Sequence, residues 1–212
     1  MNPKIRLTRQ QSQAQTRQRL LAAAHALFAA HGFNATSVEQ IALEAGYSRG
    51  AFYSNFQTKA EVFLVLLQQE HEAIMAELHT LLETPAADDP DGTPPRHLLE
   101  ARLLDFYARL HRNTTLQVLL LEARLLALRD PDFAMHFQRF QQHLLDAVGH
   151  YALIFTQRAG LAPSMAPQDM ALGFVALCDG MALYRMENGP ADDNERAEHI
   201  LRAFMKKMAF EP

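Results

Sequence analysis

The sequence has little of what builds disulfide-rich, secreted or membrane-spanning proteins. Its 212 residues include a single cysteine, Cys178, which excludes an internal disulfide framework and favours a reducing compartment. The longest apolar run, residues 170–184, contains Asp179 and is shorter than the roughly 20 residues that a membrane-spanning helix needs. The basic N-terminus is not followed by an apolar region, so we expect no secretory signal. These absences predict a cytoplasmic protein without a membrane partner.

The motifs of common catalytic and metal sites are also missing. The sequence has no HExxH or CxxC ligand pair, no G-x-S-x-G elbow and no glycine-rich phosphate-binding loop. His136, His143 and His150 recur every seven residues, but such positions on one helix lie about 10.5 Å apart along its axis, too far to share one ion. Cys178 lies in an apolar segment and is interpreted as an inert core residue. We therefore predict a protein that is not an enzyme and holds no metal or other cofactor.

Apolar residues recur at helical spacing along most of the chain. No stretch alternates with a period of two, so strands are not expected. The hydrophobic content of 49% is ordinary for a globular protein. We predict an all-α fold of about nine helices with a proline- and aspartate-rich loop at residues 84–95. After residue 57, the expected helices span about residues 58–82, 96–112, 114–128, 132–159, 168–187 and 192–208.

Residues 36–59, TSVEQIALEAGYSRGAFYSNFQTK, hold the most closely spaced helix signals. Thr36 with Glu39, and Ser37 with Gln40, both form an S/T-x-x-E/Q capping box, so a helix begins here whichever residue caps it. The apolar residues that follow share one helical stripe. This pattern predicts a short amphipathic helix at the start of the segment.

A tight turn and a second short helix follow at once. Gly46 supplies the flexible joint of the turn. Ser48 caps the second helix, in which Phe52 and Phe56 face inward, and a further capping box at Thr58 opens the next helix. The positions left to face outward are Arg49, Gly50, Ala51, Ser54 and Asn55. A generic helical hairpin does not need capping and turn residues spaced so closely. The segment therefore predicts a helix-turn-helix that binds DNA.

Residues from about Thr16 to Leu67 resemble the TetR family of bacterial transcriptional regulators. The resemblance covers a helix ending in FAAHGF, the segment TSVEQIALEAGYSRGAFYSNF and the segment TKAEVF. It is carried by Gly32, Thr36, Ile41, Ala42, Gly46, Tyr53, Phe56 and Lys59. It implies a three-helix DNA-binding domain at residues 1–57 and a helical effector-binding and dimerisation domain at residues 58–212. Some members carry an aromatic or basic residue where this chain has Ser54, which leaves the operator sequence open.

Charge is distributed unevenly along the chain. Residues 1–60 contain seven Lys or Arg and two acids, a charge of +5. The remainder has 13 basic and 22 acidic residues, a charge of −9, and the two parts recover the net charge of −4. A basic module with an acidic remainder favours attraction to phosphates at one end of the chain.

The second short helix, Ser48 to Asn55, is predicted to lie in the major groove. Arg49 is the expected base reader, because its guanidinium group matches the O6 and N7 acceptors of guanine. Gly50 allows the backbone to approach closely, and Ala51 can contact a thymine methyl group. The resemblance, together with hydrogen-bond donors near helix ends, predicts phosphate contacts by Thr36, Ser37, Tyr53, Asn55 and Lys59. A packing role for Tyr53 and a solvated position for Lys59 remain as alternatives.

The helix expected at residues 168–187 is apolar almost all round and must be covered on both sides. In the TetR family the last two helices pair with their two-fold mates, so the resemblance implies a homodimer that binds a palindromic operator. A fully intramolecular core is the alternative.

The C-terminal domain is expected to bind a small apolar or amphipathic effector that releases DNA, with repression as the usual outcome in the family. The candidate walls of its pocket are Leu103, Phe106, Tyr107, Leu110, Leu121, Leu125, Phe137, Phe140, Phe174 and Cys178. Simple core packing is the alternative for each of them. The competing function is an architectural DNA-binding protein without an effector, and an apolar cavity would favour the sensor.

Overall fold

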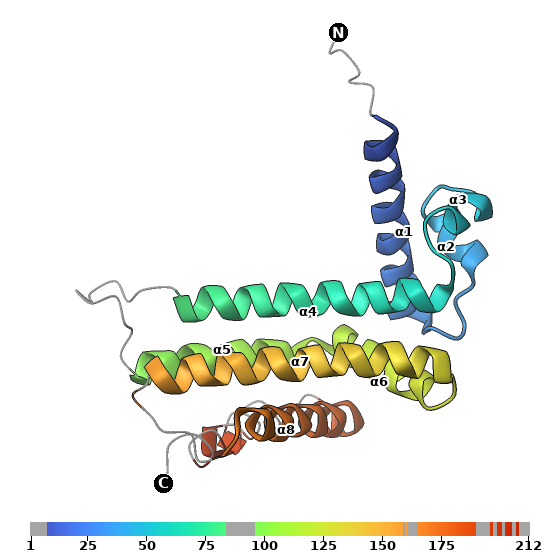
Figure 1. The fold of residues 1–212 in the computed structure, drawn as a ribbon. Coiled ribbons are helices and arrows are strands. Elements are labelled where there is room, and N and C mark those ends of the chain that lie inside the picture. The colour runs from blue at the N-terminus through green and yellow to red at the C-terminus, as the bar shows by residue number, and fades with distance from the viewer. Residues whose placement is uncertain are drawn as a thin grey trace. The chain divides into compact units, whose positions relative to one another are not determined.

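The computed structural model describes residues 8–83, 96–158, 160, 165–189, 196, 199–200, 202–204 and 207. All regular structure in these residues is helical (Figure 1), which confirms the predicted all-α fold. The helices are α1 (Arg9–His31), α2 (Val38–Glu44), α3 (Arg49–Tyr53), α4 (Lys59–Glu83), α5 (Arg96–Arg112), α6 (Thr114–Ala127), α7 (Pro131–Arg158) and α8 (Pro167–Asn188). The loop predicted at residues 84–95 lies outside the described residues, as does much of the helix predicted at residues 192–208. The described residues between 196 and 207 are helical.

Local capping sets the helix boundaries. The Thr8 hydroxyl accepts the Gln11 amide N–H at 3.2 Å and opens α1. The Asp130 carboxylate accepts the amide N–H groups of Asp132 and Phe133 at 3.0 and 3.1 Å and opens α7. Helices α7 and α8 both begin at a proline, one residue earlier than predicted. Proline is favoured there because the first N–H of a helix has no intrahelical acceptor.

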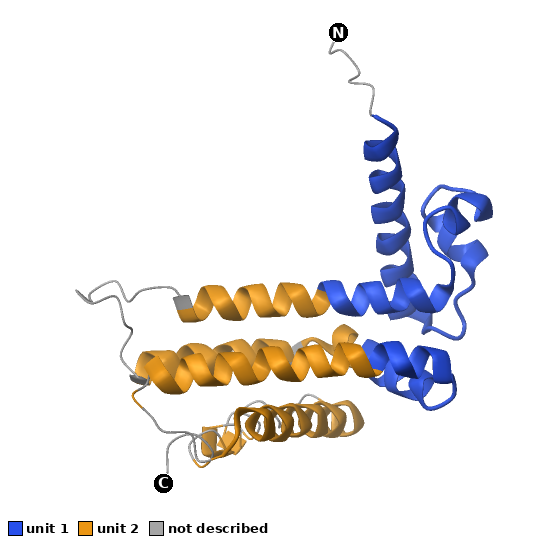
Figure 2. Ribbon diagram, viewed as in Figure 1, with its two compact units in different colours: residues 1–69, 118–137 blue, residues 70–117, 138–212 orange. Residues whose placement is uncertain are grey.

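The chain divides into two compact units (Figure 2), unit 1 with residues 1–69 and 118–137 and unit 2 with residues 70–117 and 138–212. Beyond the boundary expected after residue 57, unit 1 also takes in the start of α4 and residues 118–137. The ring of Phe63, in that first part of α4, stacks on Phe33 with centroids 5.0 Å apart and on Phe133 with centroids 6.2 Å apart. These aromatic contacts join the start of α4 to the first core.

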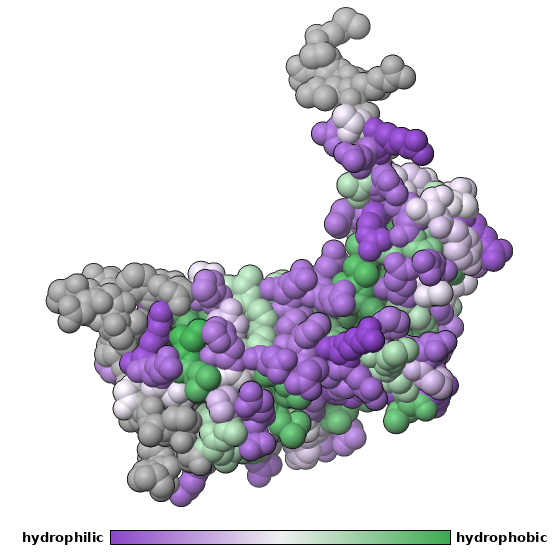
Figure 3. Space-filling model, viewed as in Figure 1, coloured by the Kyte–Doolittle hydropathy of each residue, from purple (hydrophilic) through white to green (hydrophobic). Residues whose placement is uncertain are grey.

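The rest of the unit 1 core comes from the inner residues of α1, α2 and α3 and from the parts of α6 and α7 in this unit, where Leu119, Ala123 and Phe137 are buried. Phe28, Phe52 and Ile41 are fully buried, one from each of the first three helices. The outer part of α1 is mainly hydrophilic on the face shown in Figure 3, in keeping with its polar sequence before Leu20. Helix α1 therefore contributes to the core mainly through its second half.

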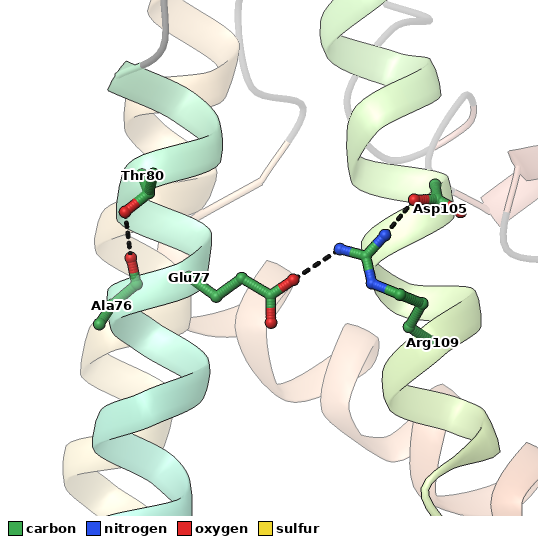
Figure 4. Close-up of polar contacts among 5 residues, drawn as sticks. All are labelled: Ala76, Glu77, Thr80, Asp105 and Arg109. Atoms are coloured by element: carbon green, nitrogen blue, oxygen red, sulfur yellow. Dashed lines mark hydrogen bonds and ion pairs between the residues drawn. The ribbon is translucent and has the colours of Figure 1, made fainter.

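Unit 2 has a separate core formed by α4, α5 and α7, and its buried members are Leu78, Leu82, Leu99, Leu103, Phe106 and Phe155. At the surface, Arg109 of α5 contacts Asp105 of the same helix and reaches Glu77 of α4 at 2.6 Å (Figure 4). Exposed ion pairs contribute little to stability, so the apolar core is the main link between these helices. None of the helices in the described part of the chain has the length and hydropathy of a membrane span.

Candidate nucleic-acid interface and apolar cavity

Helix α2 is capped by Ser37. The Ser37 hydroxyl accepts the Gln40 amide N–H at 3.2 Å, and the Gln40 side chain accepts the Ser37 amide N–H at 2.8 Å. Thr36 has a different role, because it is only 2% exposed and its hydroxyl donates to the Gly32 carbonyl at 2.8 Å. The prediction that the Thr36 side chain contacts phosphate is therefore corrected. Its hydroxyl is part of the interior of the α1–α2 connection.

Helix α3 is positioned by one cap and two buried rings. Gly46 adopts a positive φ of 76°, as the turn before α3 requires. The Ser48 hydroxyl accepts the Ala51 amide N–H at 3.3 Å. Phe52 and Phe56 are buried at 0% and 2% exposure, so the opposite face of α3 is directed to solvent.

The outward face of this short helix carries most of the residues predicted to contact DNA. Arg49, Gly50, Tyr53 and Ser54 are exposed, as is the cap Ser48, whereas Ala51 and Asn55 are half-buried. The Ser54 hydroxyl donates to the Gly50 carbonyl at 2.9 Å, and the Asn55 amide donates to the Ala51 carbonyl at 2.8 Å. Both side chains thus have local acceptors before any ligand arrives.

The Arg49 guanidinium lies between α2 and the end of α3. Its Nε is 3.1 Å from the Glu39 carboxylate, and its carbon Cζ lies 5.4 Å from the centroid of the Tyr53 ring. Interaction with the Tyr53 hydroxyl and the Glu39 charge raises the already high pKa of Arg49. Arg49 is therefore a permanent cation held at the exposed face of α3.

Lys59 is held more tightly than a solvated lysine would be. Its ammonium donates to the carbonyls of Phe33 and Thr36, both at 2.6 Å, and lies 4.2 Å from the centroid of the Phe33 ring. Burial lowers the pKa of Lys59, and the Glu122 charge partly opposes that shift. An ammonium has three donors, so two carbonyl contacts leave one hydrogen for an anion.

Glu122 of α6 completes this cluster by binding the same residue, Phe33, through the peptide group that precedes it. Its carboxylate accepts the Phe33 amide N–H at 2.5 Å. Gly32 has a positive φ of 82°, and a Cβ there would collide with the Glu122 carboxylate. Glu122 and Lys59 thus bind the N–H and the C=O of Phe33 and fix the connection that leads into α2.

Three further residues support this candidate interface without a signal in the sequence that assigns them to it: Glu122, Glu39 and Arg17. Arg17 of α1 donates to the Asn55 carbonyl at 2.8 Å, and its carbon Cζ lies 4.0 Å from the centroid of the Phe56 ring. These contacts anchor the end of α3. These partners are 38 residues apart in sequence, and Glu122 and Phe33 are 89 apart. No local spacing rule identifies such pairs. Only the capping box drew attention to Glu39.

Unit 2 contains an apolar cavity of about 70 Å³. It is lined by Leu78, Leu82, Leu103, Tyr107, Val148, Tyr151, Ala152, Phe155, Met170, Ala171, Phe174 and Phe204. Two tyrosines are the only members of this lining with side-chain polar groups, and burial raises the pKa of Tyr107. The cavity is smaller than the roughly 150 Å³ that admits benzene, so a larger guest requires it to expand.

The residues predicted to wall an effector pocket lie in different places relative to this cavity. Leu103, Tyr107 and Phe174 line the cavity, whereas Phe106 is buried in the unit 2 core beside it and Leu110 packs against that core. The other predicted wall residues do not line it, because they lie in unit 1 or face elsewhere in unit 2: Leu121, Leu125, Phe137, Phe140 and Cys178. Leu125 is an exposed surface residue.

Helix α8 leaves one apolar stripe uncovered. Met170, Ala171 and Ala182 are buried on its inner face. The exposed stripe recurs at helical spacing and consists of Leu172, Ala176, Gly180, Leu183 and Tyr184. Its middle is made of small residues, which allow another helix to approach closely.

Comparisons with known proteins agree with this arrangement. Residues 20–66 match the family model of bacterial regulatory proteins, tetR family. The transcriptional repressor BepR of Brucella suis is 31% identical over 91 residues, which cover 43% of this chain and 41% of BepR. The transcriptional activator FasR of Mycolicibacterium smegmatis is 27% identical over 181 residues, which cover 85% of this chain and 77% of FasR.

A solved structure extends the similarity beyond the matched segment. SmeT, the repressor of the Stenotrophomonas maltophilia multidrug efflux pump SmeDEF, is 25% identical with a TM-score of 0.64, and the match covers 92% of this chain and 91% of SmeT. The chain spans less than half of the length of BepR.

A capped helix-turn-helix followed by a helical bundle defines this chain as a helix-turn-helix protein of the transcription-regulator class. Its residues 20–66 belong to the bacterial regulatory proteins, tetR family, and the fold over 92% of the chain is similar to that of SmeT. These relatives are regulators of transcription and not enzymes. They confirm the prediction that the protein is not an enzyme.

Proposed function

We propose that the protein regulates transcription by placing α3 in the major groove of an operator. The observation that carries this proposal is the exposed face of α3, where Arg49 points outward from a helix held in place by the buried Phe52 and Phe56. Arg49 then reads a guanine, Gly50 and Ala51 approach the bases, and Ser37 and Tyr53 approach phosphates. Lys59 adds a phosphate contact through its remaining N–H. BepR and SmeT are repressors and FasR is an activator, and we propose that this protein acts as a repressor.

The acting species is proposed to be a homodimer formed through α8 and the helical segment after it. The support is the exposed apolar stripe of α8, in which Leu172 is 56% exposed. A two-fold dimer presents two copies of α3, so its operator has matching half-sites.

A small molecule is proposed to bind the unit 2 cavity and weaken DNA binding. The support is the cavity itself, which also favours the sensor over an architectural protein without an effector. SmeT has been solved in complex with triclosan, a precedent for such a ligand in this fold. Because the lining has two phenolic hydroxyls and no charged side chain, a small neutral apolar molecule suits it best. The effector must bind the DNA-incompetent arrangement more tightly, since equal affinity shifts no equilibrium.

A mobility-shift titration with DNA from the region flanking its gene tests the DNA-binding proposal. The wild-type protein should retard one fragment well below the concentration needed for random DNA of equal length. Arg49→Ala should lower specificity by about 1–3 kcal/mol at one operator position. Arg129→Ala, which removes the same charge from an exposed site outside the helix-turn-helix, is the matched control. Equal losses on specific and random DNA for Arg49→Ala would refute the role of Arg49.

A further inference from the structure

Glu39 is an acidic residue on a surface that the proposed function places against DNA. It lies in the first turn of α2, where the Ser37–Gln40 capping box fixes the backbone. Its side chain is 57% exposed, and the Arg49 side chain that it contacts is 63% exposed. A carboxylate near DNA phosphates is repelled by them, so its presence beside the main base reader needs a physical reason.

The geometry of the ion pair supplies that reason. Glu39 contacts Arg49 through Nε, the guanidinium nitrogen nearest the main chain, at 3.1 Å. The two terminal nitrogens, which match O6 and N7 of guanine, lie beyond that contact. The Tyr53 ring, one helical turn after Arg49, lies near the same guanidinium. The side chain is thus oriented by partners on both α2 and α3.

We propose that Glu39 is a positioning residue that determines base specificity through Arg49, an inference that rests on the proposed DNA-binding function. An unpaired arginine is attracted to any phosphate along the duplex. When Nε is paired with Glu39, moving the Arg49 guanidinium to a DNA phosphate breaks the ion pair. A contact between its terminal nitrogens and a guanine keeps the ion pair. The Glu39 charge also subtracts from the attraction to DNA of any sequence. The pair therefore favours base contact over backbone contact.

The test removes the Glu39 charge while keeping its shape. Glu39→Gln is compared with Glu44→Gln, which removes the same charge from an exposed site at the other end of α2. Each variant is titrated with the flanking-region duplex and with random duplex of equal length at several salt concentrations. Glu39→Gln should bind random DNA more tightly and lower the specific-to-random affinity ratio by about two- to fivefold, the range expected for an exposed ion pair. Glu44→Gln should leave the ratio at the wild-type value.

A double variant separates positioning from a merely structural effect. If Glu39 acts through Arg49, adding Glu39→Gln to Arg49→Ala should not lower the ratio further. Three results overturn the inference: an unchanged ratio in Glu39→Gln, an equal fall in Glu44→Gln, or a further fall in the double variant. A fall in melting temperature confined to Glu39→Gln would assign the effect to folding and overturn it too.

Failure of the inference and failure of the proposed function give different results. If the wild-type protein does not distinguish flanking-region DNA from random DNA, the result contradicts both the proposed function and the role of Glu39. If the wild-type protein distinguishes them and Glu39→Gln does so equally well, only the role of Glu39 falls.

Discussion

The two basic side chains expected at the DNA differ in how the protein holds them. Arg49 is exposed and paired at the surface, whereas Lys59 donates to two backbone carbonyls. The carbonyl contacts of the Lys59 ammonium serve the fold, and its remaining N–H is the one that we propose to contact phosphate. Burial lowers the pKa of Lys59, which means that the site disfavours the charged form, and the Glu122 charge partly offsets that effect.

Lys59→Met tests this double role, because methionine keeps most of the apolar stem and removes the ammonium. Loss of the charge-assisted contacts to Phe33 and Thr36 should lower the free energy of unfolding by about 1–2 kcal/mol. Binding should weaken alike on all DNA sequences, and the salt slope should fall by about 1. Chemical denaturation and binding titrations across salt measure both effects.

Glu122→Gln is the matched control for the Lys59 variant, since glutamine keeps an oxygen that accepts the Phe33 N–H but removes the charge. It should destabilise the fold less than Lys59→Met. A Lys59→Met protein with wild-type stability and an unchanged salt slope would contradict the assigned role.

Cys178 gives a prediction about pH. Burial raises the pKa of its thiol from 9.0 to about 12. A raised pKa means that the unfolded chain loses this proton first. The contribution of Cys178 to stability is therefore complete below pH 9 and decreases as the pH rises from about 9 towards 12. The raised pKa of Tyr107 acts in the same direction.

Denaturation midpoints measured at pH 7, 8, 9 and 10 check the pH prediction, with Cys178→Ala as the control that removes the titrating thiol. Stability should decline above pH 9, and the decline should be shallower in the variant. Rapid alkylation of Cys178 in the folded protein at pH 8 would show that the thiol is neither buried nor protonated.

At the scale of elements, helix positions could be predicted from the sequence because caps and breakers act locally. Three helix starts are each set by residues no more than four positions away. They are the start of α2 after Ser37, of α3 after Ser48 and of α8 at its proline. Most predicted boundaries differ from the observed ones by one or two residues. The choice between Thr36 and Ser37 as the cap needed the structure, because Thr36 is drawn inward by the Gly32 carbonyl.

The cavity walls could not be predicted in the same way. They come from α4, α5, α7, α8 and the segment containing Phe204, and helical periodicity marks an inward face without showing which neighbour it meets. Phe137 and Phe140 share the inward stripe of α7 with Val148, yet only Val148 reaches the cavity. Which inward residue lines a void depends on tertiary packing over long sequence separations.

The exposed stripe of α8 gives a prediction about assembly. Leu172→Glu places a charge on a side chain that is already exposed in the protomer, so it should leave the fold intact. If α8 forms the dimer, this charge should convert the protein to a monomer at micromolar concentration. Sedimentation velocity measures the change. Leu128→Glu is the control, because Leu128 is an exposed leucine of unit 1, whereas Leu172 lies in unit 2, and this variant should remain dimeric. A dimeric Leu172→Glu protein would exclude α8 from the interface.

At the scale of the whole molecule, a basic N-terminal module is joined to an acidic remainder, with +5 on residues 1–60 against −9 on the rest. Binding to DNA of any sequence should therefore depend strongly on salt, although the net charge is −4. Because one α3 is only five residues long, it covers few bases, and a specific site needs two copies acting together.

The most direct test of the account is the mass and footprint of the complex that the purified protein forms with its flanking-region DNA. Sedimentation equilibrium should give an even number of protomers on each duplex. Footprinting should show protected half-sites related by two-fold symmetry and centred about 34–36 Å apart on one face of the helix. A single protomer per duplex, or no binding to that DNA even at low salt, would contradict the account.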